Sequence, residues 1–98
     1  FLENYPDSPL SASILIARGN AFEGLGEIKK AARAYLNSFS LYEDSPVAPE
    51  ALTLLGNALV SLGQTDAGCQ TLAQVLMRFP GSDFSLEAEK MMSELQCP

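Results

Sequence analysis

Apolar residues recur along this chain at intervals of three and four positions, and no stretch alternates apolar with polar residues as a strand would. The spacing predicts five helices, over residues 10–24, 27–41, 47–62, 66–78 and 83–96. Turns containing Gly or Pro separate them, because glycine readily takes the left-handed conformation that ends a helix. We therefore predict an all-α chain.

The residues at the helix ends support these boundaries. Ser8 is a good N-cap before Pro9, and Thr65 is a candidate N-cap for the fourth helix. Within the first helix the spacing predicts a buried face made of Leu10, Ile14, Ala17, Ala21 and Phe22. Each helix is expected to pack on its neighbours through such a face.

The chain repeats itself every 37 residues. Residues 19–21, Gly-Asn-Ala, return as residues 56–58, and the Leu-Gly pair at 25–26 returns at 62–63. A fixed period in this range is typical of stacked helical repeats. Such arrays mostly bind other proteins along an extended concave surface, so the repeat favours a binding protein over an enzyme.

Small residues lie where the two helices of each pair would approach one another. Gly19 and Gly56 belong to the first helix of each pair, while Ala31 and Gly68 come early in the second. Together with Pro80 after a second helix, this arrangement resembles the tetratricopeptide repeat. The resemblance implies an all-α tetratricopeptide-repeat solenoid of two full helix hairpins plus a terminal helix.

The same resemblance divides the chain into units of a single domain over residues 1–98. We expect two complete units and one partial unit, at about 10–46, 47–82 and 83–98. Residues 1–8 parallel the end of the next unit and are interpreted as the tail of a preceding repeat. The chain is therefore expected to be a fragment of a longer protein, and it carries no signal peptide.

The net charge of the chain limits which classes of partner it is expected to bind. Six Lys and Arg residues stand against twelve Asp and Glu residues, and the net charge of −6 argues against nucleic acid and against an anionic membrane surface. The longest apolar run is far too short to span a bilayer, so no membrane insertion is expected. Lys29, Lys30 and Arg33 form the one basic cluster, which is either a solvated helix face or a docking site for an acidic partner.

No constellation of residues in the sequence indicates catalysis. The chain contains no His, so the usual nucleophile–base pairs and the usual four-ligand zinc sites cannot form. We therefore expect no enzyme activity, no metal and no cofactor. Protein partners remain as the expected ligands.

The two cysteines, Cys69 and Cys97, leave two alternatives open. They are either two buried thiols or one disulfide formed in an oxidising compartment. In a stack of helices the two would lie on the same edge, where a bond would contribute roughly 3 kcal/mol through loop-closure entropy.

One segment carries a more specific resemblance. Residues 54–66, with Cys69 and the Arg-Phe-Pro-Gly-Ser run at 78–82, resemble the C-terminal tetratricopeptide domain of the periplasmic Tol–Pal system protein, the cell division coordinator family. The resemblance covers essentially the whole chain and is strongest from Pro49 to Ser82. The Tyr-Pro-Asp-Ser connector at residues 5–8 also resembles that of other envelope proteins, such as the outer-membrane assembly lipoproteins.

This resemblance implies a periplasmic adaptor without catalytic activity. The family binds TolA and links outer-membrane constriction during cell division to peptidoglycan synthase machinery. It oligomerises through an N-terminal coiled coil that this chain lacks. Periplasmic export favours the Cys69–Cys97 disulfide over two thiols. The alternative is a generic envelope scaffold for outer-membrane assembly or for self-association.

The tetratricopeptide resemblance also predicts where a partner would bind. Asn20 and Asn57 follow the two packing glycines, and amides at that place can hold an extended peptide backbone. The alternative is that both are ordinary solvated residues. The predicted concave groove comprises Ser13, Ile16, Asn20, Glu23, Glu50, Thr53, Asn57, Val60 and Lys90.

Overall fold

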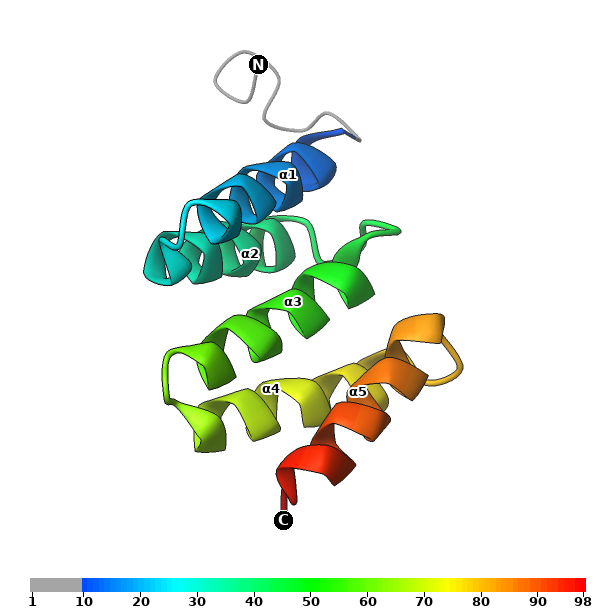
Figure 1. Cartoon of the computed structure of the whole chain (residues 1–98). Coiled ribbons are helices and arrows are strands. Elements are labelled where there is room, and N and C mark those ends of the chain that lie inside the picture. Colours follow the sequence, from blue (N-terminus) through cyan, green and yellow to red (C-terminus); the bar gives the residue numbers. More distant parts are fainter. Residues whose placement is uncertain (1–9) are drawn as a thin grey trace.

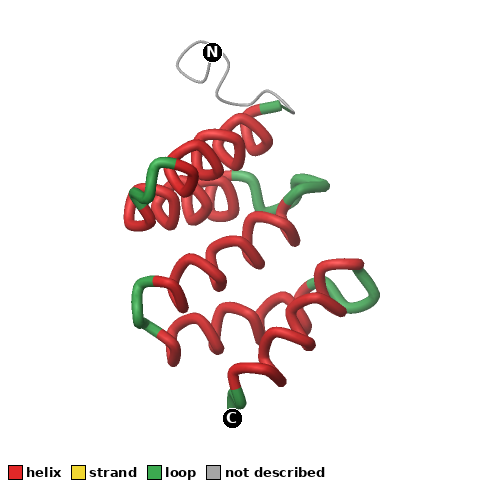
Figure 2. The backbone as a smooth tube through the Cα atoms, in the orientation of Figure 1, coloured by secondary structure: helices red, strands yellow, loops and turns green. Residues whose placement is uncertain are grey.

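The computed structural model describes residues 10–98, and within that range it contains five helices and no strand (Figures 1 and 2). The helices are α1 (Ser11–Gly24), α2 (Ile28–Leu41), α3 (Ala48–Ser61), α4 (Thr65–Arg78) and α5 (Asp83–Leu95). Each boundary lies within a residue or so of the predicted one. The all-α prediction is confirmed.

The helices stack in chain order into an elongated slab (Figure 1). Each helix packs on the next one along the chain, and α3 also contacts α5. The slab measures 43 × 30 × 16 Å along its principal axes. Because the main contacts join helices that are one or two places apart in the chain, this is the architecture of a helical repeat and not of a globular bundle.

The turns after α1 and α3 share one geometry. Gly26 and Gly63 have φ angles of +79° and +83°, which residues with a side chain rarely adopt. In both turns the next residue donates its N–H across the glycine, from Glu27 to Phe22 O at 2.8 Å and from Gln64 to Leu59 O at 2.9 Å. These bonds satisfy carbonyls that would otherwise lack a partner at the helix end, as the predicted glycine stop requires.

The core runs along the centre of the slab. Tyr35, Ala51, Leu72 and Val75 are fully buried, and Phe39 and Ala88 join the same cluster. Residues from α1 through α5 therefore contribute to one continuous apolar core, in which each helix covers the apolar face of the one before it.

The predicted buried face of α1 was wrong for three of its five residues, whereas Phe22 packs against the core and Ile14 is half-buried. Ala17 and Ala21 are exposed, and Leu10 is 60% exposed. The helix instead buries Ala12, Leu15, Ile16 and Gly19. The run of apolar residues at 14–17 gives this helix no single apolar side, so its contact with α2 decides which side turns inward.

The predicted N-cap at Thr65 was also wrong. The residue in the N-cap position of α4 is Gln64, whose side chain makes no capping hydrogen bond, and Thr65 is the first helical residue. A true side-chain cap occurs at α5, where Ser82 Oγ accepts the N–H of Ser85 at 3.1 Å. The predicted cap at Ser8 and Pro9 lies outside the described residues.

Candidate protein-binding surface

The two helices of each hairpin approach closely at a glycine. A Cβ added to Gly19 would lie 2.7 Å from Cδ1 of the Tyr35 ring, and one added to Gly56 would lie 2.9 Å from Cγ of Leu72. A Cβ on Gly68 would lie 3.0 Å from the carbonyl oxygen of Gly56. The predicted role of these glycines in helix packing is therefore visible in both hairpins.

Tyr35 connects the core to the surface. The whole side chain is buried, with the ring beneath Gly19 and the hydroxyl against Asn20 and Glu23 of α1. The O–H donates to Asn20 Oδ1 at 2.7 Å and is shared with Glu23 Oε2 at 3.1 Å. Since the carbonyl of Asn20 is engaged, the amide N–H groups are the donors that this residue can offer to a ligand.

The surroundings of the Tyr35 hydroxyl keep it protonated. Burial of the ring is the main cause, followed by the hydrogen bond to Glu23 and the negative charges of Glu23 and Glu50, and together they raise the pKa of Tyr35 well above its ordinary value. The hydroxyl therefore acts as a donor across the physiological pH range. Residues from α1, α2 and α3 share one electrostatic environment at this place.

The equivalent place in the second hairpin differs. At the 37-residue spacing Asn57 replaces Asn20, Leu72 replaces Tyr35 and Val60 replaces Glu23. Asn57 is exposed, and neither Leu72 nor Val60 has a polar group that could engage its amide. Asn57 can thus present both a donor and an acceptor to a ligand, whereas Asn20 presents donors beside a carboxylate.

The nine residues predicted for the groove do not share one degree of exposure. Ser13, Asn20, Asn57 and Lys90 are exposed. Glu23, Glu50 and Val60 are half-buried.

Ile16 and Thr53 must be removed from the predicted accessible surface. Ile16 is 5% exposed and belongs to the core cluster. Thr53 is 1% exposed, and its hydroxyl donates to Pro49 O at 2.8 Å within its own helix. Because this bond satisfies the hydroxyl, Thr53 can be buried at little cost, which its polar side chain did not suggest.

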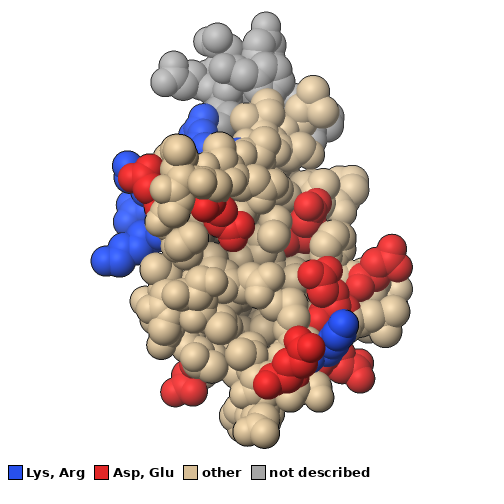
Figure 3. All heavy atoms as spheres, viewed as in Figure 1, with Lys and Arg blue, Asp and Glu red and all other residues tan. Residues whose placement is uncertain are grey.

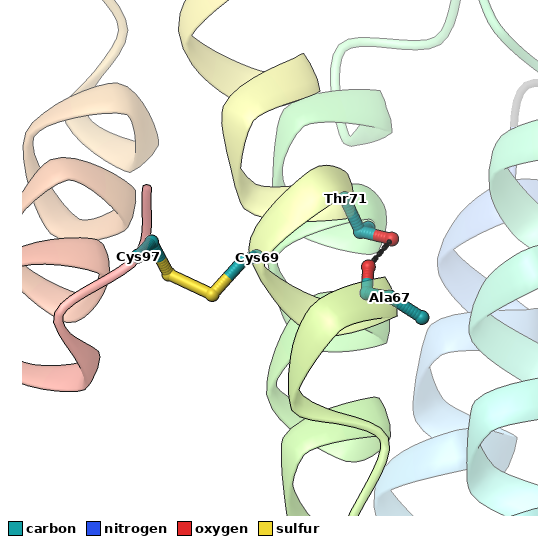
Figure 4. The surroundings of a disulfide bond; sticks show 4 residues. All are labelled: Ala67, Cys69, Thr71 and Cys97. Carbon is teal, nitrogen blue, oxygen red and sulfur yellow. Dashed lines mark hydrogen bonds between the residues drawn. A yellow bond between two sulfur atoms is a disulfide. The ribbon is translucent and has the colours of Figure 1, made fainter.

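A disulfide joins α4 to the segment after α5 (Figure 4). Cys69 and Cys97 are bonded, with their Cα atoms 5.7 Å apart and 28 positions apart in the sequence. Gln96 has a φ of +56°, and the N–H of Cys97 donates to Met92 O at 2.9 Å. The chain thus turns back at the end of α5, and this turn brings Cys97 to α4.

Charge is distributed unevenly over the molecule. Most Lys and Arg side chains in view gather on one flank of the α1–α2 hairpin, whereas the surface near α5 is mainly acidic, with one basic side chain among the Asp and Glu (Figure 3). Arg18, which is distant in sequence from Lys29, Lys30 and Arg33, lines the same hollow as Lys30 and Arg33. Only the packing of α1 on α2 reveals that a basic residue of α1 belongs to this cluster.

Other kinds of site lack support in the part of the chain that is described. No group of three or more His, Cys, Asp or Glu residues within residues 10–98 is arranged to hold a metal ion. No helix in the same range is long and apolar enough to cross a membrane.

A tetratricopeptide-repeat family model matches residues 50–82, which correspond to the hairpin of α3 and α4. No curated protein sequence matches the chain. The match and the stacked helix pairs agree, so the fold is an all-α helical repeat of the tetratricopeptide type. Repeats of this type are typically non-catalytic modules that bind other proteins.

Proposed function

We propose that this chain is a non-catalytic protein-binding module of the bacterial periplasm, and that it acts with the Tol–Pal system by binding TolA. The observation that carries the proposal is the exposed pair Asn20 and Asn57, repeated at the same place in two tetratricopeptide-type hairpins. Two amides at a fixed spacing suit an extended segment, because they bind its backbone without requiring one sequence.

The proposed compartment is supported by the disulfide. Disulfides form and persist in oxidising compartments, among them the bacterial periplasm. The Cys69–Cys97 bond fits such a location. The proposed role in cell division and outer-membrane constriction is supported by the resemblance of residues 49–82 to the cell division coordinator family.

The acidic residues of the face bearing Asn20 and Asn57 indicate which charge a bound segment would carry. Glu23 and Glu50 are half-buried and close enough to Tyr35 for both to act on its hydroxyl. A Lys or Arg of the bound segment would pair with these carboxylates, while its backbone would meet Asn20 and Asn57. An extended segment with a basic residue is thus the proposed ligand for this face.

Calorimetric titration of the oxidised chain with the periplasmic region of TolA tests the proposal. We expect saturable binding that Asn57→Ala weakens more than Asn20→Ala, because only Asn57 offers both a donor and an acceptor. Ser40→Ala serves as a control, since this exposed residue of α2 lies outside the predicted groove. Absence of saturable heat would overturn the TolA assignment, and binding unaffected by both Asn variants would move the site to another surface.

A second candidate function is self-association as an envelope scaffold. Leu86 on α5 is 70% exposed and Met77 on α4 is 72% exposed, so a second copy of the chain that covered either residue would remove apolar surface from water. Sedimentation at two concentrations tests it. A weight that rises with concentration and returns to the monomer value in Leu86→Ser would support self-association, and a strict monomer would exclude it.

A further inference from the structure

Two of the hollows along the basic flank of the first hairpin lie on either side of α2. One, of about 440 Å³, opens between α2 and α3 and is lined by Lys29, Arg33, Leu36, Leu55 and Leu59, among others. The other, of about 230 Å³, opens between α1 and α2. Both include Arg33 and Asn37, so α2 forms the ridge between them. None of the nine residues predicted for the groove lines either hollow.

The floor of each hollow is apolar. Leu36 is 46% exposed at the first, beside Leu55 and Leu59. Leu15, Phe22 and Ala34 line the second. Each hollow therefore offers apolar surface that would be removed from water by a large apolar side chain inserted from a partner.

The charged residues that line both hollows are all basic. Arg18, Lys29, Lys30 and Arg33 line them, and no Asp or Glu does. Lys30 is already engaged, since its Nζ lies 3.1 Å from Glu27 Oε1 and 5.7 Å from the centre of the Phe22 ring. Within residues 10–98 no carboxylate pairs with Arg18, Lys29 or Arg33, so three cations are available to a partner.

The basic rim is not inherited from the repeat design. At the 37-residue spacing the second hairpin has Leu55 in place of Arg18, Asp66 in place of Lys29, and Gln70 in place of Arg33. If this flank only had to be polar, acidic and basic residues would serve there equally well. Here one hairpin concentrates four of the six Lys and Arg residues of an acidic chain, with apolar residues between them.

We infer that this basic flank docks an acidic amphipathic helix of a partner protein. Apolar residues on one face of that helix would enter the two hollows, and carboxylates beside them would pair with Arg18, Lys29 and Arg33. Charge complementarity selects this partner over a basic segment. The flank is a second surface, and it acts independently of the groove proposed for TolA.

The test uses a fluorescently labelled synthetic helix with Leu along one face and Glu on either side. We expect saturable binding to the oxidised chain by fluorescence anisotropy, and weaker binding at high salt because the rim charges are exposed. Arg33→Glu should lower the affinity about tenfold, since it replaces an attraction with a repulsion. The double variant Gln70→Glu, Gln74→Glu is the matched control: it makes the same two-unit change in net charge at exposed positions of α4 that line neither hollow, and it should leave the affinity within about twofold.

Several outcomes would overturn the inference. Equal loss of affinity in Arg33→Glu and in the Gln70→Glu, Gln74→Glu double variant would show a general effect of net charge and no site. Equal binding of a matched helix with Lys in place of Glu would show that the charge of the flank does not select the partner. If the chain self-associates and Arg33→Glu abolishes this self-association, the flank binds a second copy of the chain and not an acidic helix. Asn57→Ala should not change the affinity for the synthetic helix, which keeps this test separate from that of the groove.

Discussion

The two hairpins solve the same packing problem with different side chains. In each, a glycine of the first helix lets the second helix approach, and one large side chain of the second helix fills the space beneath it. That side chain is Tyr35 in the first hairpin and Leu72 in the second, and both are fully buried. A repeat of fixed geometry thus accepts an aromatic ring and an aliphatic chain at one position.

The difference between Tyr35 and Leu72 is chemical. Leu72 ends in methyl groups, so the surface above it depends only on Asn57 and Val60. Tyr35 carries a buried hydroxyl that binds Asn20 and Glu23, two residues that reach the surface. A change in the core of a repeat can therefore alter the binding chemistry of its surface without altering the fold.

Loss of the disulfide should destabilise α5 more than the two hairpins. Within the described residues α5 is not followed by another helix, and the Cys69–Cys97 bond holds its end on α4. Replacing both cysteines with Ala should lower the free energy of unfolding by about 3 kcal/mol, measured by denaturant titration. Hydrogen exchange should show greater loss of protection in α5 than in α1 and α2.

Wild-type protein treated with a reductant is the matched control for the disulfide variant. It should lose the same stability while keeping both sulfur atoms in place. Equal stability of the oxidised and reduced chains would contradict a stabilising bond.

A methyl group on the packing glycine should cost more in the first hairpin than in the second. In Gly19→Ala the new Cβ meets the rigid ring of Tyr35, whereas in Gly56→Ala it meets the flexible end of Leu72. We expect losses of about 2 kcal/mol and about 1 kcal/mol respectively, after the better helix propensity of Ala is included. Thermal and denaturant unfolding of both variants measure the difference, and a larger loss in Gly56→Ala would contradict the comparison.

Tyr35→Phe should make the first hairpin resemble the second. The ring remains, but the hydrogen bonds to Asn20 and Glu23 are lost, at a cost of about 1 kcal/mol to the free energy of unfolding. In this variant Asn20 regains its free carbonyl and should become as important for TolA binding as Asn57. Unchanged stability would show that the hydrogen bonds from the hydroxyl to Asn20 and Glu23 are no more favourable than hydrogen bonds to water.

The same variant should change the response to alkaline pH. Because the pKa of Tyr35 is raised in the folded chain, an unfolded chain releases this proton near pH 10 while the folded chain keeps it. The contribution of Tyr35 to stability is therefore complete below pH 10 and falls as pH rises above it. Unfolding curves from pH 8 to 11 should decline less steeply in Tyr35→Phe than in wild type, and parallel declines would contradict the raised pKa.

Local signals were sufficient to predict the helices and the turns. Apolar spacing located all five helices, and Gly26 and Gly63 marked the ends of α1 and α3, because these features depend on neighbouring residues alone. The packing role of Gly19, Gly56 and Gly68 followed from their place in the repeat. The 37-residue repeat in the sequence was therefore enough to predict the role of these glycines.

The details that depend on distant contacts could not be predicted. Residues 14–17 are all apolar, so the packing of α1 on α2 decides that Ile16 is buried and Ala17 exposed. Thr53 is buried because α3 packs on α2, α4 and α5, and the hydrogen bond to Pro49 O lowers the cost of that burial. The bonds from Tyr35 to Asn20 and Glu23 require the register of α2 against α1, which spacing within either helix does not contain.

If the face bearing Asn20 and Asn57 binds the partner, the side-chain amides of these two residues will respond to it. Their resonances can be recorded in an isotope-labelled chain during titration with the periplasmic region of TolA. We expect shifts for Asn20 and Asn57, with Asn37, on the basic flank, unchanged as an internal reference. Shifts at Asn37 with none at Asn20 and Asn57 would show that TolA binds the flank and not the face bearing Asn20 and Asn57.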